Sequence, residues 1–142
     1  MAPYSFFTAF NYHPPIIGFS SIGYKDTVRN IQATENFTWN LATQSLATSM
    51  NKTSDPVSAD ESEFEHAGLT PAPSSLVSAP RVAESPVSFE CRVTQVVQLA
   101  GAGGSLLETW LVLGEVVGVH IDKELITEGG VFDTVAAQPI LR

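Results

Sequence analysis

The sequence predicts a mainly β, α+β fold, in which an antiparallel sheet closes toward a barrel and short helices lie at its periphery. The last third contains two long β-prone runs, residues 87–99 and 106–121, separated by the glycine-rich loop 101–105. The first third contains two more, residues 4–12 and 16–22, joined by a turn with two prolines. Helical or irregular patterns lie between these two pairs. Sequential antiparallel hairpins with helices between them are typical of barrel-like α+β domains.

The length and composition predict one globular domain over residues 1–142. The chain has 142 residues, of which 44% are hydrophobic and only 15% are charged. That size allows a substantial core, and that composition disfavours extensive disorder. The net charge of −8 disfavours nucleic acid and anionic membranes as partners.

The single cysteine and the hydropathy pattern bear on compartment. Cys91 has no intramolecular cysteine partner, which fits a reducing compartment, so we expect a cytoplasmic protein. No run reaches the roughly 18 apolar residues of a membrane span.

The first strand, residues 4–12, is rich in aromatic residues, which is the composition of a central strand. Only three residues precede it, so we expect further chain upstream in the protein, without which one edge of this strand would be unpaired. Residues 16–22 should pair antiparallel with it across the proline-containing turn.

A candidate anion site follows the second strand. Ser20 and Ser21 precede a turn at Gly23, and Lys25 and Thr27 lead into a predicted helix over residues 28–33, capped by Asp26 or Thr27. A helix N-terminus with hydroxyl groups and a lysine favours phosphate. A capped helix with a solvated lysine fits the same pattern. The local sequence leaves both interpretations open, and it favours the second.

The sequence pattern changes in the middle of the chain. Residues 37–41 alternate as a strand, and residues 42–51 have helical spacing. Residues 53–86 contain five of the nine prolines and read as a surface excursion, with one short helix around Phe64 and Ala67. The acidic run 60–65 within it predicts a solvated face, and a partner or lid role is the alternative.

The strand 87–99 predicts one apolar and one polar face. Its apolar face includes Cys91, a packed thiol, and its polar face includes Ser88, Glu90, Arg92 and Thr94. Residues 131–142 form a final segment of uncertain type.

Evident catalytic chemistry is absent from the sequence, so the catalytic residues stay unknown. The glycines at 101–104 are followed by a predicted strand, which excludes a dinucleotide-binding loop. His13, His66 and His120 lack metal-ligand spacing and read as turn, surface and sheet histidines, so no metal site is expected. An anion corner without an acid, base or nucleophile suits a cofactor that brings its own reactivity.

Blocks along the whole chain together resemble the flavin reductase-like, FMN-binding split-barrel family, which includes flavoredoxin. They are APYSFF (2–7), HPP (13–15), KDTVRNI (25–31), FTWNL (37–41), EFEHAGLT (63–70), PRVAESPV (80–87), FEC (89–91), GEVV (114–117), HI (120–121) and PILR (139–142).

The resemblance implies a six-stranded antiparallel split barrel that forms a homodimer, with noncovalent FMN near the dimer interface. By matching the family, Ser20, Ser21, Lys25 and Thr27 would hold the phosphate. The isoalloxazine ring would lie along the first strand, at Ser5, Phe6, Phe7, Thr8, Ala9, Phe10 and Asn11. The aromatic side chains of that strand also fit a purely structural role in the core.

The implied activity is hydride transfer from NAD(P)H to bound or free flavin, with an oxygenase or another acceptor downstream. A non-catalytic FMN-binding electron carrier is the alternative. The chain lacks the N-terminal hairpin and C-terminal segment typical of the family, so a truncated, inactive fragment is a further alternative.

Overall fold

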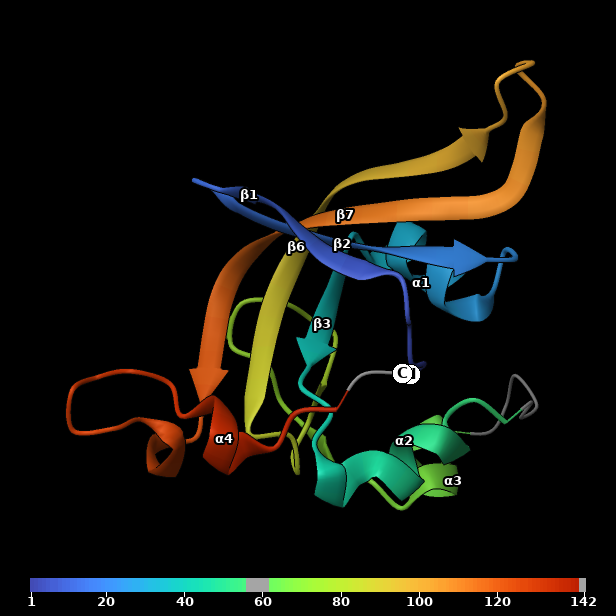
Figure 1. Cartoon of the computed structure of the whole chain (residues 1–142). Helices are drawn as coiled ribbons and strands as arrows, with labels where there is room; N and C mark the ends of the chain where they lie inside the picture. The colour runs from blue at the N-terminus through green and yellow to red at the C-terminus, as the bar shows by residue number, and fades with distance from the viewer. Residues whose placement is uncertain (56–61, 141–142) are drawn as a thin grey trace.

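The main sheet of the computed structural model has five strands in the order β1-β2-β7-β6-β3, and all neighbouring strands are antiparallel (Figure 1). The structure describes residues 1–55 and 62–140. The strands of this sheet are β1 (Phe7–Tyr12), β2 (Pro15–Ile22), β3 (Asn36–Asn40), β6 (Val87–Ala100) and β7 (Leu106–Ile121). A separate two-stranded ladder joins β4 (Pro71–Ala72) to β5 (Arg81–Val82). The described sheet thus has five strands where the family resemblance implied six.

Short helices surround the sheet, as the sequence predicts. They are α1 (Asp26–Thr34), α2 (Ala47–Lys52), α3 (Glu63–Ala67) and α4 (Thr134–Ala137), with 3-10 turns η1 (Gln44–Leu46) and η2 (Lys123–Leu125). In Figure 1, α1 lies near β2, whereas α2, α3 and α4 lie at the opposite end of the molecule. Asp60 and Glu61 of the acidic run, and the last two residues of the chain, lie outside the described residues.

The helix predicted over residues 42–51 is divided. Thr43 is extended and forms an isolated bridge with Pro139, and the N–H of Gln44 donates to the carbonyl of Gln138. This pairing with the C-terminal segment holds residues 42 and 43 out of the helix, so regular α-structure begins only at Ala47. The final segment, whose type the sequence leaves uncertain, therefore pairs with residues 43 and 44, just before α2.

The core lies between β2, β3, β6, β7 and α1. Its buried residues are Ile17, Phe19, Ile31, Phe37, Cys91 and Val112. The rings of Phe19 and Phe37 meet edge to face with centroids 5.6 Å apart. Phe37 packs directly on the backbone of Gly114, where an added Cβ would lie 2.5 Å from its Cε1 atom. This close approach explains why a glycine interrupts the apolar run of β7.

The expectation that one edge of the first strand would be unpaired in this chain is confirmed, because β1 pairs only with β2 in the described sheet. The side chains of β1 are correspondingly open, with Phe10 50% and Tyr12 82% exposed. Within the described residues the outer edge of β1 meets no strand. An aromatic, exposed edge strand is a surface suited to contact with a ligand or another chain.

The predicted polar face of β6 is buried at Glu90. Glu90 lies on the same face as Arg92, since the two residues are opposite Thr38 and Asn36 of β3, yet Glu90 is completely buried. The Glu90 carboxylate accepts hydrogen bonds from the backbone N–H groups of Ser75, Leu76 and Val77, at 2.8, 2.6 and 3.1 Å. It also contacts Nε2 of His120 on β7 at 2.5 Å. We call this carboxylate and its four partners the Glu90 clamp.

The Glu90 clamp sets the protonation state of its carboxyl group. Burial raises the pKa of Glu90, but the hydrogen bonds from the Ser75 N–H, His120 and the Leu76 N–H outweigh burial and lower the pKa to about 2. The group is therefore ionised across the neutral range, with acceptor sites matched to buried donors.

We predict that the clamp makes folding stability depend on acid. The folded pKa of about 2 lies below the ordinary value of 4.5, so the stabilisation is complete above pH 4.5 and is lost as the pH falls toward 2. Glu90→Gln should lower the free energy of unfolding at pH 7 by about 1–3 kcal/mol. It should also flatten the decline between pH 4.5 and 2, measured by urea unfolding at several pH values.

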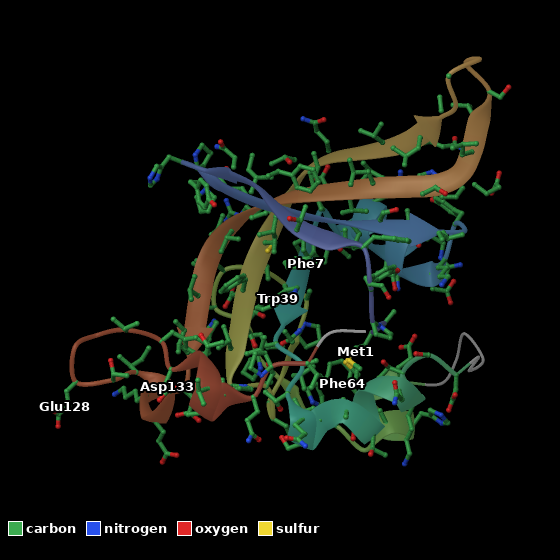
Figure 2. The ribbon with its side chains drawn as sticks, in the orientation of Figure 1. Met1, Phe7, Trp39, Phe64, Glu128 and Asp133 are labelled. Carbon is green, nitrogen blue, oxygen red and sulfur yellow. The ribbon has the colours of Figure 1, made fainter. Side chains whose placement is uncertain are left out.

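Glu128→Gln, at an exposed loop position labelled in Figure 2, is the matched control and should retain the wild-type acid dependence. An acid profile of Glu90→Gln identical to that of the wild type would contradict the assigned role.

Candidate functional site

The predicted anion corner forms where β2 ends and α1 begins. Gly23 makes the turn with φ +88°, a left-handed conformation that favours glycine. Its N–H donates to the carbonyl of Glu108 at 2.8 Å, and its carbonyl accepts the hydroxyl of Ser21 at 3.0 Å. These bonds fix the direction in which the chain enters α1.

The N-terminus of α1 has no side-chain cap. Lys25, and not Asp26 or Thr27, is the N-cap residue, and it makes no side-chain capping hydrogen bond. The Asp26 carboxylate instead forms an ion pair with Arg29 at 2.8 Å, which compensates the one negative charge in that turn. Uncapped N–H groups and the helix dipole therefore combine with the exposed Lys25 ammonium at one place.

The four residues predicted to bind phosphate differ in their exposure to solvent. Lys25 is exposed, and Ser20 and Thr27 are half-buried. Ser21 is completely buried, and its hydroxyl is used within the turn. Neighbouring residues of a strand point to opposite faces, so the two serines cannot both face one ligand. The structure thus assigns Ser21 to the turn and leaves Ser20, Lys25 and Thr27 accessible.

The predicted ring-binding segment, residues 5–11, runs beside this corner. The carbonyl of Phe6 accepts the N–H of Ser20 at 2.9 Å, which ties the start of β1 to the phosphate side of β2. Residues 5–11 are all exposed. Asn11 is committed to the hairpin turn, because its Nδ2 donates to the Pro14 carbonyl at 2.8 Å.

The aromatic residues of β1 lie on both of its faces. Phe7 stacks on Trp39 with ring centroids 5.3 Å apart, and Figure 2 shows the two side by side beneath β1. Trp39 stacks in turn on Phe89, at 4.7 Å. Phe10 lies over Gly18, where an added Cβ would be 2.8 Å from its ring. Two of the predicted ring-binding side chains thus have packing roles of their own.

Other candidate chemistry is confined to structural roles. Burial, together with the nearby charge of Glu90, raises the pKa of the Cys91 thiol to about 12, so no thiolate nucleophile exists at neutral pH. His13 lies in the β1–β2 turn, His66 pairs with Asp55 on the surface, and His120 belongs to the sheet, as predicted. Among residues 1–55 and 62–140, no cluster of three or more His, Cys, Asp and Glu could hold a metal.

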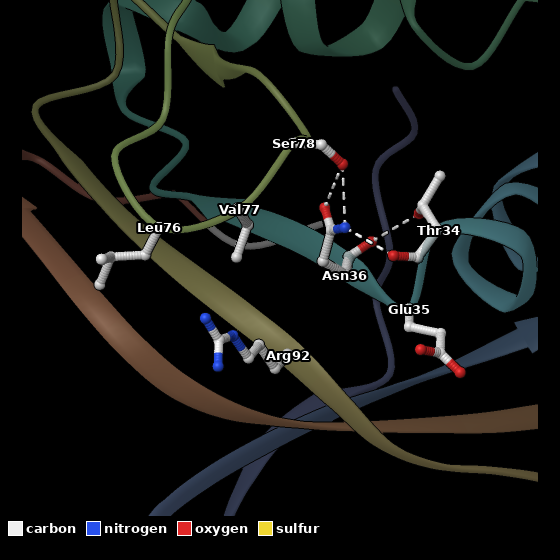
Figure 3. Close-up of a pocket in the computed structure, with 7 residues that line it drawn as sticks. All are labelled: Thr34, Glu35, Asn36, Leu76, Val77, Ser78 and Arg92. Atoms are coloured by element: carbon white, nitrogen blue, oxygen red, sulfur yellow. Dashed lines mark hydrogen bonds between the residues drawn. The ribbon is translucent and has the colours of Figure 1, made fainter.

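Sequence reasoning missed two features. The first is the Glu90 clamp, since a strict period-2 reading places Glu90 on the solvent face. The second is a pocket of about 400 Å³ beside it (Figure 3). Its lining comes from residues 34–36, 76–78 and Arg92, which are distant in sequence. Pro-rich excursions such as 70–86 carry no periodic signal from which their contacts could be predicted.

The structure has no described helix that is long and apolar enough to cross a membrane. Comparison with known proteins gives a family match over residues 1–137, to the family described as "Flavin reductase like domain".

An uncharacterized protein of Halalkalibacterium halodurans is 37% identical over 147 residues, covering 99% of this chain and 69% of the relative. Nitrilotriacetate monooxygenase component B from Bacillus cereus has a similar structure, with TM-score 0.88 and 32% identity, covering 97% of this chain and 69% of that one. Pseudomonas fluorescens 2-nitrobenzoate 2-nitroreductase aligns with TM-score 0.83 and 27% identity, covering 97% and 66%. The chain thus spans about two thirds of the length of these relatives.

The relatives with named activities are a monooxygenase component and a nitroreductase, and the fold described above is similar to theirs over 97% of this chain. The chain therefore belongs to the flavin reductase-like family.

Proposed function

We propose that this protein binds FMN noncovalently and transfers hydride from NAD(P)H to bound or free flavin. One observation carries the proposal: α1 begins without a side-chain cap at a residue, Lys25, whose ammonium group adds to the helix dipole. Ser20 and Thr27 supply hydroxyl donors on either side of that point in the chain. Membership of the flavin reductase-like family supports a flavin phosphate as the anion.

The donor set fits a terminal phosphate. A phosphate monoester carries nearly two negative charges and accepts several hydrogen bonds. The corner offers one full positive charge, two hydroxyl groups and the first-turn N–H groups of α1. Arg29 neutralises Asp26, so the carboxylate in the first turn does not oppose the anion fully. Ser21 shapes the turn and need not touch the ligand.

The first strand is the proposed support of the isoalloxazine ring, along residues 5–11. β1 is an edge strand, so backbone groups on its outer side meet no other strand in the described part of the chain. Such N–H groups can bind the polar edge of the ring and favour negative charge there. Stacking of Phe7 on Trp39 and the Phe6–Ser20 backbone bond hold this strand in place.

When bound, flavin supplies the redox chemistry by accepting hydride from NAD(P)H and passing electrons to an acceptor. The protein positions the cofactor and its partners. Free flavin, an oxygenase or another protein would take the electrons. The similarity to a monooxygenase component supports an oxygenase.

A flavin-binding electron carrier without nucleotide turnover is the second candidate. The corner favours it in one respect, because its described side chains include no histidine, cysteine or uncompensated carboxylate for proton transfer. Hydride transfer between nucleotide and flavin needs no such group, so the choice between the two functions rests on nucleotide reactivity.

We predict that NADH or NADPH bleaches the visible absorbance of the FMN-loaded protein under anaerobic conditions. A competent reductase should do so at about 1–1,000 s⁻¹ with saturating nucleotide, measured by stopped flow. Dithionite reduction of the same sample is the control for accessible flavin. Bleaching by dithionite but by neither nucleotide would contradict the reductase and support the carrier.

We further propose that the protein is a homodimer. The β6–β7 hairpin extends beyond the rest of the sheet in Figure 1 and exposes apolar side chains, among them Leu106 at 68% and Leu107. Phe10, Tyr12 and Ile22 on β1 and β2 are also exposed. Apolar side chains exposed together on one hairpin are typical of an interface, and a second copy would cover them.

Sedimentation velocity at micromolar concentration should accordingly give a dimer. Leu106→Glu should shift it toward monomer, because burying an unpaired charge at an interface is costly. Val135→Glu, on α4 at 87% exposure, introduces the same charge away from the hairpin and should leave the dimer intact. A wild-type protein that stays monomeric would remove this proposal.

A further inference from the structure

A pocket on the outer side of β3 and β6 is lined by residues that have no part in the proposed flavin site. Its volume is about 400 Å³, and its lining residues are Thr34, Glu35, Asn36, Leu76, Val77, Ser78 and Arg92. Asn36 and Arg92 are cross-strand partners on β3 and β6, and residues 76–78 overlie them (Figure 3). The pocket is therefore a space between the sheet and the loop that the Glu90 clamp holds.

The walls of this pocket are fixed. The Glu90 clamp binds the N–H groups of Leu76 and Val77. Asn36 completes the wall: its Oδ1 accepts the Ala79 N–H at 2.9 Å, and its Nδ2 donates to the Thr34 carbonyl at 2.7 Å and to the Ser78 hydroxyl at 2.9 Å. These polar groups have partners within the protein, so the pocket exists without a ligand to organise it.

Arg92 is the one lining cation, and its guanidinium has no ion pair or hydrogen bond among the described residues. Arg29 and Arg81, by contrast, bind Asp26 and the Pro73 carbonyl. Figure 3 shows the Arg92 guanidinium and the side chains of Leu76 and Val77 facing one space, whereas the carboxylate of Glu35 points away from it. Positive charge and apolar surface thus lie together in a protein of net charge −8.

We propose that this pocket binds a small amphipathic carboxylate. The Arg92 guanidinium pairs with the carboxylate group through two parallel N–H donors, and Leu76 and Val77 contact the apolar body. Glu35 at the rim and Glu115, the cross-strand neighbour of Arg92 on β7, weaken the attraction by like charge. Millimolar affinity, about 1–10 mM, is therefore expected for a ligand of this size.

Amide chemical shifts of the full chain test the proposal, with benzoate as the probe. Benzoate should produce saturable shifts at the amides of residues 34–36 and 76–78. Acetate, which lacks the apolar body, and benzyl alcohol, which lacks the charge, should each bind at least about tenfold more weakly.

Substitutions test which charged side chains contribute to benzoate binding. Arg92→Gln should weaken benzoate binding at least about tenfold, and Arg92→Lys should weaken it less. Glu35→Gln should strengthen it about two- to threefold by removing like charge. Lys123→Gln, on η2, makes the same charge change as Arg92→Gln outside the pocket lining and should have no effect. Retained amide dispersion in each variant shows that the fold is intact.

Shifts at residues 20–27 alone, or benzoate affinity unchanged in Arg92→Gln, would overturn the proposal. Both readouts are independent of flavin, so the proposed reductase function can fail while this site stands.

Discussion

The buried carboxylate of Glu90 is the interaction on which the arrangement around the sheet depends. Removing a carboxylate from water is costly, and here three backbone N–H groups and His120 compensate it. The same residues bring β6, β7 and the long connection before β6 to one point. An uncompensated loss of this carboxylate would leave the three N–H groups of residues 75–77 without their acceptor.

The outer face of β3 also binds the long connection that precedes β6. Asn36, Thr38 and Asn40 alternate on the strand, and each bonds to the connection: to Ala79, to the carbonyl of Pro80 and to the N–H of Val82. The other face of β3 presents Phe37 and Trp39 to the core and to Phe7. The polar face of β3 thus binds the connection, and its aromatic face supports β1. The carboxylate pocket therefore lies on one face of β3, and the proposed cofactor site lies on the side of the other face.

Much of this fold could be predicted from periodicity, and the exceptions have local causes. The two hairpins, α1 and the mainly β class follow from apolar alternation and turn residues. Alternation places Glu90 on the same face of β6 as Arg92, but it could not reveal that residues 75–77 cover Glu90 there. β1 has the aromatic composition of a central strand, and its unpaired outer edge among the described residues was expected because only three residues precede it. For the site, Ser20 and Lys25 stay predictions. Ser21 lies on the buried face of β2 with Ile17 and Phe19, where alternation along the strand could have placed it.

Phosphate recognition at the start of α1 is the central claim, and a comparison of FMN with riboflavin tests it most directly. Riboflavin has the same ring system and lacks the phosphate, so the protein should bind FMN about 10- to 100-fold more tightly. In Lys25→Ala that preference should shrink about tenfold, while Lys52→Ala, on α2, should keep it. Equal affinity of the unaltered protein for the two flavins, measured by fluorescence titration at moderate salt, would contradict the assignment.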